Sequence, residues 1–237
     1  MIKYKRILLK ISGESLQGEE RILDKTKLVK IADIIKDLVE EKVQVSVVVG
    51  AGNIWRGALA TEIDMERITA DYMGMLGTVI NCLALQSILE KRGLATRVCS
   101  SLPIPAVCEP YIRKKALHHL EEGRVVLLAG GTGNPFFTTD TTAALRASEL
   151  GCEIILMAKN GTDGILDKDP RQYNDAKLIK KLSYNELIRL DLKVMDATAV
   201  TLLRDNDILL RVFNINDPEN IKRIVNGENI GTIVVKE

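Results

Sequence analysis

The chain has little of what most hydrolases and metal-binding proteins depend on. Its 237 residues include two histidines, His118 and His119, which are adjacent on a predicted polar helix and which we expect to be exposed to solvent. The four cysteines lie far apart and form no Cys-x-x-Cys pair, so they are expected to be buried thiols. This scarcity argues against Ser-His-Asp hydrolysis, a cysteine nucleophile and a histidine-rich metal site. We therefore expect no metal ligands among the side chains.

An excess of charge of either sign is also missing. Lys and Arg number 33 while Asp and Glu number 32, so no overall field favours a nucleic-acid backbone or an anionic membrane. The basic first residues precede an apolar run that is too short for a signal peptide. No segment is expected to reach the length of a membrane span. We expect a cytoplasmic protein without nucleic-acid or membrane partners.

Two common nucleotide-binding motifs are absent as well. Gly13 and Gly18 have the separation of a Walker motif, but Glu19 follows where that motif needs a lysine. Gly131 begins a dinucleotide-binding pattern that fails at Phe136. Neither a P-loop nor a Rossmann fingerprint is present, so any phosphate site must be built differently.

What the sequence does have is a regular alternation of apolar runs and helical stretches. Runs rich in Val, Ile and Leu with helices between them are typical of a mainly parallel sheet, so we predict an α/β fold with three α/β/α layers. The predicted strands are residues 6–11, 43–49, 95–100, 125–129, 153–158, 211–215 and 232–235. The predicted helices are residues 25–41, 65–91, 112–122, 141–150, 183–190, 197–205 and 218–226.

The length and the apolar content favour a single domain. With 237 residues, of which 46% are hydrophobic, the chain can bury one large core. After residue 158 the sequence changes to a stretch dense in Gly, Asn and Asp, which is typical of loops. We therefore predict two lobes within one domain, residues 1–150 and 151–237.

The longest predicted helix, residues 65–91, carries a row of small residues. Ala70, Gly74, Gly77 and Asn81 are spaced three or four apart. Because glycine costs helix stability, this row predicts that a neighbouring helix approaches closely. A second copy of the chain would supply such a helix in a homo-oligomer, but packing against the chain's own sheet explains the row equally well.

Three loops that follow predicted strands have a composition suited to phosphate. Residues 10–14 read Lys-Ile-Ser-Gly-Glu, residues 50–57 are rich in glycine, and residues 130–140 combine glycines with three threonines and precede a helix. Free backbone N–H groups, hydroxyls and a helix N-terminus together make an anion site. Ligands of open α/β sheets collect at the carboxyl ends of the strands, so the loops should converge on one crevice. We expect two phosphorylated ligands there, or one that passes phosphate to another.

Several segments match one known pattern in order along essentially the whole chain. They are residues 10–14, Asn53 with Arg56, residues 70–76, residues 133–140, residues 163–164 with 169–170, and residues 193–196. Together they resemble the bacterial UMP-kinase branch of the amino-acid-kinase family, and the Phe-Phe-Thr-Thr-Asp and Val-Met-Asp segments are specific to that branch. The resemblance implies transfer of the γ-phosphoryl group of ATP to UMP in pyrimidine nucleotide synthesis. It also implies Mg²⁺ with the ATP and a homohexamer.

The resemblance assigns roles to individual positions. The implied ATP-binding residues are Lys10, Ile11, Ser12, Gly13, Gly52, Arg56, Asn160, Leu166 and Asp169. The implied UMP-binding residues are Ala51, Asp71, Thr132, Gly133, Asn134, Pro135, Phe136, Phe137, Thr138 and Thr139. Lys10, Arg56 and Asp196 are expected to be catalytic. The lobe of residues 1–150 would hold UMP, and the lobe of residues 151–237 would hold ATP. Ala51 is a departure, because the family usually has glycine there.

Other interpretations of the same residues remain open. Asp71 can pair with Arg67 one helical turn earlier, Asp196 can cap the helix that follows it, and Trp55 is expected to pack rather than to stack on a base. The chain could also phosphorylate a carboxylate or carbamate, as sister kinases do, or bind nucleotides as a non-catalytic sensor. The Phe-Phe-Thr-Thr-Asp segment favours a nucleotide acceptor, and the presence of both Lys10 and Asp196 favours catalysis.

Overall fold

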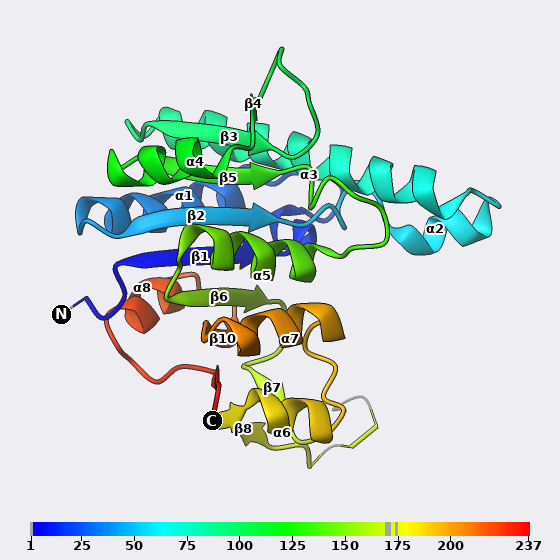
Figure 1. The fold of residues 1–237 in the computed structure, drawn as a ribbon, viewed down its shortest axis with the longest axis vertical. Coiled ribbons are helices and arrows are strands. Elements are labelled where there is room, and N and C mark those ends of the chain that lie inside the picture. The colour runs from blue at the N-terminus through cyan, green and yellow to red at the C-terminus, as the bar shows by residue number, and fades with distance from the viewer. Residues whose placement is uncertain (1, 169–171, 174) are drawn as a thin grey trace.

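The structure is a computed structural model that describes residues 2–168, 172–173 and 175–237. Its main feature is a sheet with the strand order β4-β3-β5-β2-β1-β6-β10-β11-β9 (Figure 1). Its neighbouring strands run parallel except for the antiparallel pair of β10 and β11. The strands are β1 Arg6–Ile11, β2 Gln44–Val49, β3 Thr96–Ser100, β4 Glu109–Pro110, β5 Val125–Ala129, β6 Ile154–Lys159, β9 Lys181–Ser183, β10 Leu209–Asn214 and β11 Thr232–Val235. A second, antiparallel pair joins β7 Ile165–Leu166 to β8 Leu178–Ile179.

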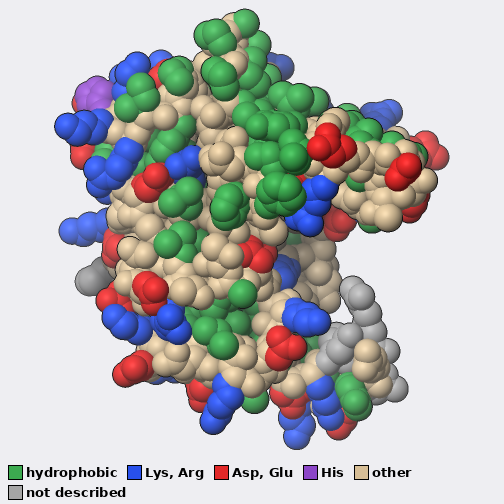
Figure 2. Space-filling model, turned by 45° about the vertical axis from the view of Figure 1, so that its right-hand side comes forward, with side chains coloured by type: hydrophobic (Ala, Val, Ile, Leu, Met, Phe, Trp, Pro, Cys, Tyr) green, Lys and Arg blue, Asp and Glu red, His purple; other side chains and the backbone are tan. Residues whose placement is uncertain are grey.

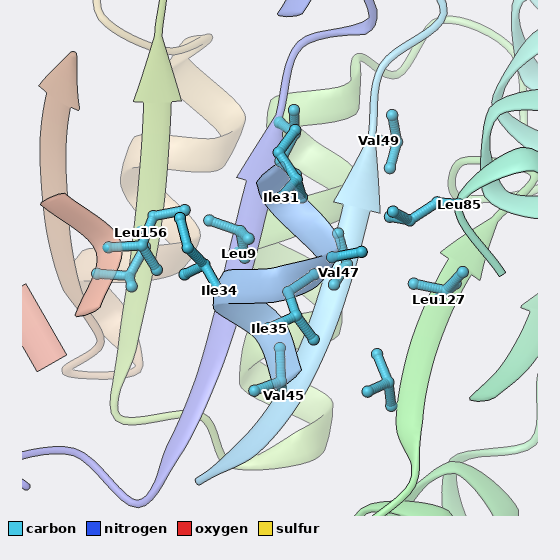
Figure 3. Close-up of a cluster of buried hydrophobic side chains, with 14 of the residues drawn as sticks. Leu9, Ile31, Ile34, Ile35, Val45, Val47, Val49, Leu85, Leu127 and Leu156 are labelled. Carbon is cyan, nitrogen blue, oxygen red and sulfur yellow. The ribbon is translucent and has the colours of Figure 1, made fainter. Parts of the chain in front are cut away.

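Helices cover both faces of the sheet. They are α1 Lys25–Glu40, α2 Gly57–Glu62, α3 Arg67–Glu90, α4 Arg113–Glu121, α5 Thr139–Leu150, α6 Tyr184–Arg189, α7 Ala197–Asp205 and α8 Glu219–Val225, with a short 3₁₀ helix at Gly13–Leu16. Along β1, Ile7 and Leu9 belong to the core under α1, α3 and α8, whereas Leu8 belongs to the core under α4, α5, α6 and α7. Figure 3 shows isoleucines of α1 packed on the first of these faces. The predicted three-layer α/β/α fold is confirmed.

The sheet continues without a break across the expected lobe boundary. In β1, Leu9 stands between Val47 of β2 and Leu156 of β6, so the first strand joins the two halves of the sheet. The chain turns from α5 into β6 at Gly151, whose φ of 65° is the left-handed conformation that suits glycine at a helix end. The central strand β1 is therefore shared by both sides of the molecule.

The predicted strands and helices are all present, with ends shifted by no more than two residues. The sequence did not reveal β4, β7, β8, β9, α2 and the 3₁₀ helix. The four strands among these have only two or three residues, too few to show a hydrophobic period.

The small residues of helix α3 make contacts that the sequence did not predict. An added Cβ on Gly77 would lie 2.9 Å from the Cβ of Ala51, and one on Gly74 would lie 3.7 Å from the indole of Trp55. Gly77 therefore makes room for the loop that follows β2, and Gly74 faces Trp55 of the same loop. By length and composition alone α3 could also cross a membrane, so the expectation that no segment reaches that length is wrong. This is weak evidence for a membrane span, since core helices of this kind pass the same test and 44% of the apolar stretch is buried here.

The cysteines and histidines lie where the sequence predicted, with one exception. The four cysteines are free and buried, and burial raises the pKa of Cys99 and that of Cys152 to about 12. His118 is exposed, but His119 is buried, so its expected exposure is wrong. Its ring lies against β4, with Nε2 3.1 Å from the carboxylate of Glu109. The two adjacent histidines thus lie on different faces of α4, one exposed and one buried.

Candidate active site

The carboxyl ends of the parallel strands meet at one edge of the sheet, and the predicted loops begin there. Lys10 in β1 stands beside Val48 in β2 and Met157 in β6. Because β5 pairs with β2, the loops after β1, β2 and β5 start next to one another. Figure 2 shows the surface hollowed on this side, between the projecting α2 end and the lower half of the molecule.

A lysine and a carboxylate pair at the centre of this edge. The Nζ atom of Lys10 lies 2.7 Å from Oδ1 of Asp140, and the two side chains are 14% and 21% exposed. Asp140 belongs to the first turn of α5, where the helix dipole favours negative charge. A second lysine, Lys159 at the end of β6, donates from Nζ to the carbonyl oxygen of Val194 at 2.8 Å. Burial lowers the pKa of Lys159, Asp140 opposes this shift and Lys10 adds to it.

Asp196 joins the start of α7 to the start of α5. Its carboxylate accepts hydrogen bonds from the hydroxyl groups of Thr138 and Thr141 and from the backbone N–H of Ala199. Burial raises the pKa of Asp196, but the hydrogen bonds from Thr138, Ala199 and Thr141 outweigh it and hold the pKa below its usual value. Asp196 is thus the predicted helix cap. The carboxylate that pairs with Lys10 in the described part of the chain is Asp140.

The loops after β1 and β2 touch through their backbones. A Cβ on Gly13 would lie 2.3 Å from Oδ1 of Asn53 and 2.7 Å from the carbonyl oxygen of Gly50, so only glycine fits. The side-chain amides of Asn53 and Asn81 bond to each other at 3.0 and 2.8 Å, and Asn81 also donates to the carbonyl oxygen of Gly50 at 2.7 Å. This buried pair fixes the β2 loop to α3.

Ser12 and Asn160 connect the β1 loop to the other lobe. The Oγ atom of Ser12 accepts from the N–H of Ser15 at 3.2 Å and caps the short 3₁₀ helix. The hydroxyl of Ser15 in turn donates to Oδ1 of Asn160, which follows β6, at 3.3 Å. The hydroxyl groups of the first loop thus reach the side of the molecule that follows residue 150.

Arg56 lies at the exposed mouth of the site. Its Nη2 atom is 2.9 Å from Oε1 of Glu14, and its Nε donates to the carbonyl oxygen of Gly52 at 3.2 Å. Both side chains of the pair are more than 45% exposed, so the ion pair adds little stability and Arg56 can turn toward a ligand. The side chain of Ile11, by contrast, is fully buried, so only the backbone of this residue can contact a ligand.

A cavity of about 260 Å³ lies between α3 and the loop after β5. Seven of the ten residues expected to bind UMP line it, namely Ala51, Asp71, Thr132, Asn134, Phe137, Thr138 and Thr139. Gly133, Pro135 and Phe136 belong to the same loop but are not among the lining residues. We call this space the acceptor cavity, after the acceptor nucleotide that the sequence leads us to expect there. The sequence therefore located one wall of a real cavity, and Trp55 adds an indole that the motifs did not point to.

Ala51 is accommodated despite the usual glycine at its position. It is 9% exposed, and its methyl group lies against Gly77. Trp55 lies nearby, and its Nε1 is buried without a hydrogen-bond partner among the described residues. The extra methyl of Ala51 is thus absorbed by α3, and its backbone remains at the acceptor cavity.

A second cavity of about 520 Å³ lies in the other lobe. Its walls include Lys159, Leu166, Val194 and Val212. We call it the donor cavity, after the ATP that the sequence leads us to expect in this lobe. Of the positions expected around the ATP base and ribose, Leu166 lines this cavity. Asn160 instead lines a neighbouring hollow of about 240 Å³. Asp169, also expected to bind ATP, lies outside the described residues.

A hollow of about 590 Å³ at the sheet edge formed by β9 and α6 holds none of the predicted residues. It lies away from the carboxyl ends of the central strands. In the part of the chain that the structure describes, no group of three His, Cys, Asp or Glu side chains could hold a metal ion.

Sequence reasoning gave no role to three residues that the structure places at the site. Lys159 ends an apolar strand, where a lysine is unusual, and Asp140 follows two threonines at a helix start. Asn81 is the one amide in the row of small residues on α3. Each signal was visible, but their partners come from other segments, and only the fold brings these together.

Together, the fold and the site place two lysines, an arginine and glycine-rich loops at one edge of a parallel sheet, an arrangement typical of α/β enzymes that act on phosphorylated ligands. The family model described as "Amino acid kinase family" matches residues 5–214, and the chain belongs to this family. The family resemblance predicted from the motifs is confirmed.

Individual relatives support a narrower likeness. A curated uridylate kinase from Streptococcus thermophilus is 51% identical over 233 residues, which are 98% of this chain and 95% of that protein. The crystal structure of UMP kinase from Bacillus anthracis matches with a TM-score of 0.96 at 42% identity, covering 99% of this chain and 97% of that one. UMP kinase from Ureaplasma parvum matches with a TM-score of 0.93 at 39% identity, over 99% of this chain and all of that one.

Proposed function

We propose that this chain is a nucleoside monophosphate kinase that transfers the γ-phosphoryl group of ATP to UMP, giving UDP and ADP. The observation that carries this proposal is that the cationic centre adjoins the walls of two cavities. Asp140, the partner of Lys10, directly follows Thr139 of the acceptor cavity, and Lys159 lines the donor cavity. The similarity to uridylate kinases supports the choice of UMP and ATP.

The chemistry of the acceptor explains why the site has no histidine. The attacking oxygen of UMP is already an ionised phosphate oxygen, so a general base would add little. Catalysis then depends on bringing two polyanions together and on stabilising the charge of the phosphoryl group in transfer. Lys10, Lys159 and Arg56 supply positive charge, and the N–H groups around Gly13 and Gly52 supply donors. Asp140 orients Lys10.

The cavity walls support the proposed division of labour between the lobes. Every residue that lines the acceptor cavity falls within residues 1–150, and every residue that lines the donor cavity falls within residues 151–237. The phosphates are held by β1 and the loops after β1 and β2, through Lys10, Ile11, Ser12, Gly13, Gly52 and Arg56, of which Gly52 also lines the acceptor cavity. Leu166 contacts the ATP base, and Asn160 contacts the nucleotide from the same lobe. Asp169, also expected to bind ATP, lies outside the described residues.

Asp196 supports the pair of Lys10 and Asp140 indirectly. Through the hydroxyls of Thr138 and Thr141 it fixes the start of α5, and with it Asp140. Its effect on the reaction is then to hold the acceptor loop and the carboxylate that orients Lys10. Asp71 holds the UMP ribose, and residues 132–139 surround the acceptor nucleotide.

Magnesium enters the proposed reaction together with ATP. The absence of a three-carboxylate cluster among the described residues fits an ion held mainly by phosphate oxygens and water, as Mg²⁺ prefers. A bound Mg²⁺ neutralises charge on the phosphates of the donor. The protein's own contribution is the set of lysines, Arg56 and backbone donors.

The exposed side of α3 supports self-association. Ile68, Tyr72, Leu76 and Ile80 follow one another at four-residue spacing and are each between 39% and 47% exposed. Figure 2 shows hydrophobic side chains gathered over the half of the molecule that includes α3 and β3. Such a continuous apolar stripe is typical of a subunit interface. We propose that this stripe contributes to a homo-oligomer, in keeping with the expected homohexamer.

The proposed reaction serves pyrimidine nucleotide synthesis and draws on ATP, so a cytoplasmic place of action goes with it. The test is to incubate the protein with Mg-ATP and one candidate acceptor at a time, and to measure ADP. UMP should be the preferred acceptor over CMP and dUMP. Turnover of glutamate or carbamate in its place would indicate a sister kinase, and tight nucleotide binding without ADP formation would indicate a sensor.

A further inference from the structure

The tip of the loop beside the acceptor cavity holds a strained residue. Phe136 has a φ of 72°, a left-handed conformation that bulky side chains rarely adopt. Gly130, Gly131 and Gly133 of the same loop also have positive φ values, but glycine adopts them without strain. The Phe136 side chain is 61% exposed, so burial does not hold it in place. Other contacts must stabilise this conformation.

Those contacts come from the first turns of α3. The N–H of Phe136 donates to Oδ2 of Asp71 at 2.7 Å. Arg67, one turn before Asp71, places its Nε 3.5 Å from the same oxygen. The guanidinium carbon of Arg67 also lies 5.4 Å from the centre of the Phe136 ring, within range of a cation–π interaction. Each of the three residues therefore contacts the other two.

We propose that Arg67, Asp71 and Phe136 form a latch that holds the acceptor loop in its binding conformation before the nucleotide arrives. Arg67 and Phe136 are positioning residues in this scheme. The inference deepens the proposed function and rests on it for the identity of the nucleotide. The latch itself belongs to the ligand-free protein.

The latch leaves Asp71 able to bind a ligand. Its Oδ2 atom is engaged by Phe136 and Arg67, while the described contacts include no hydrogen bond to Oδ1. Asp71 also lines the acceptor cavity. One oxygen can thus hold the loop while the other accepts a hydrogen bond from a sugar hydroxyl. A nucleotide that meets an ordered loop pays no further cost for ordering it.

The test separates the latch from direct binding by using Arg67. Amide hydrogen exchange of residues 130–140 is measured in the nucleotide-free protein for the wild type and for Arg67→Gln. We expect exchange to be about 2- to 5-fold faster in the variant, the factor that corresponds to an exposed cation–π contact. The KM for UMP should rise by a similar factor, while kcat falls by less. Lys91→Gln, which removes a positive charge just past the other end of α3, is the matched control.

Variants of Phe136 test whether the three residues act as a unit. Phe136→Tyr keeps the ring and should exchange like the wild type, whereas Phe136→Ala keeps the strained position and loses the ring. If the latch exists, Arg67→Gln adds little to Phe136→Ala, because both remove the same contact. Additive effects, or equal exchange in Arg67→Gln and Lys91→Gln, would overturn the proposal.

The two proposals can fail independently. Faster loop exchange in a protein that does not phosphorylate UMP would support the latch and refute the proposed function. Normal UMP phosphorylation with unchanged loop exchange in Arg67→Gln would refute the latch alone. Exchange in β1 and β2 reports whether each variant is still folded.

Discussion

The acceptor cavity and the donor cavity are built in different ways. The acceptor cavity is about half the size of the donor cavity, at 260 against 520 Å³, and hydroxyls, glycines and backbone groups make up much of its wall. The donor cavity has an apolar wall that includes Leu166, Val194 and Val212, and Lys159 also lines it. The smaller space therefore suits recognition through hydrogen bonds, and the larger one suits burial of a flat apolar group such as a nucleotide base.

The two cavities also differ in how the chain supplies their walls. The acceptor cavity takes most of its lining from α3, the loop after β2 and the loop after β5. The donor cavity collects residues from the end of β6, from β7 and its flanks, from residues 191–194 and from β10. Lining residues that follow one another in the chain can be recognised as motifs in the sequence, whereas lining residues from separate segments cannot. The difference predicts that acceptor and donor binding can be impaired separately.

The largest expected effect comes from Lys10, the lysine that pairs with Asp140 at the centre of the site. Lys10→Ala should lower kcat by about 10² to 10³ because it removes one preorganised cation from the transferring phosphoryl group. Affinity for either nucleotide alone should change much less. The measurement is ADP formation at saturating ATP and UMP, with the two dissociation constants determined by calorimetry.

Lys36→Ala is the control for this prediction, because Lys36 lies on the surface of α1 and pairs with Glu40 at 3.8 Å. It should behave like the wild type. A Lys10→Ala enzyme whose turnover stays within a few-fold of the wild type would show that the ion pair with Asp140 is structural only.

A pair of variants should separate the two cavities. Asp71→Ala is expected to raise the KM for UMP by about 10-fold or more, since it removes a charge-assisted hydrogen bond, and to leave the KM for ATP nearly unchanged. Leu166→Ala should do the reverse, with a rise of about 2- to 10-fold for ATP because apolar contact area is lost. Initial rates over both substrate concentrations give the four constants.

The comparison fails if the two variants affect both substrates alike. Equal changes in Asp71→Ala would favour a purely structural role for this carboxylate. Leu192→Ala, on the same donor wall as Leu166, provides a second substitution in the same cavity and should follow it.

The same contrast between neighbouring and separate segments explains which features could be predicted from the sequence. Alternating apolar runs predicted the strands and helices, and the 133–140 segment predicted one wall of the acceptor cavity, because both signals lie within a single stretch of chain. The pairing of Lys10 with Asp140 and the approach of Lys159 could not be predicted, since they depend on how β1, α5 and β6 are placed by the sheet. The direction of His119 depended on a helix rotation that a short polar helix does not specify.

A smaller effect is expected in the pH dependence of the donor side. Burial lowers the pKa of Lys159 from the usual 10.5, so this lysine loses its charge at a lower pH than an exposed one. Turnover should therefore begin to fall below pH 10.5 as the cation is lost. In Lys159→Arg the side chain stays charged, so the alkaline fall should move to higher pH. Measuring kcat against pH for both proteins tests this.

Stability should respond to the same titration in the opposite direction. Between the lowered pKa of the folded state and the usual value of the unfolded chain, the unfolded chain binds more protons. The contribution of Lys159 to stability therefore rises with pH in this window while activity falls. Identical alkaline profiles of turnover in wild type and Lys159→Arg would remove Lys159 from the explanation.

The smallest expected effect concerns Trp55, whose substitution should perturb neither cavity strongly. Trp55 is the only tryptophan and lines the acceptor cavity, so its fluorescence should respond to UMP and much less to an ATP analogue added alone. Trp55→Phe should abolish the signal and change the free energy of unfolding by about 1 kcal/mol or less, because the lost contact area is offset by removal of an indole N–H without a partner among the described residues. An equal response to both ligands would mean that donor binding also reshapes the acceptor side, and the two cavities would then have to be treated as one coupled site.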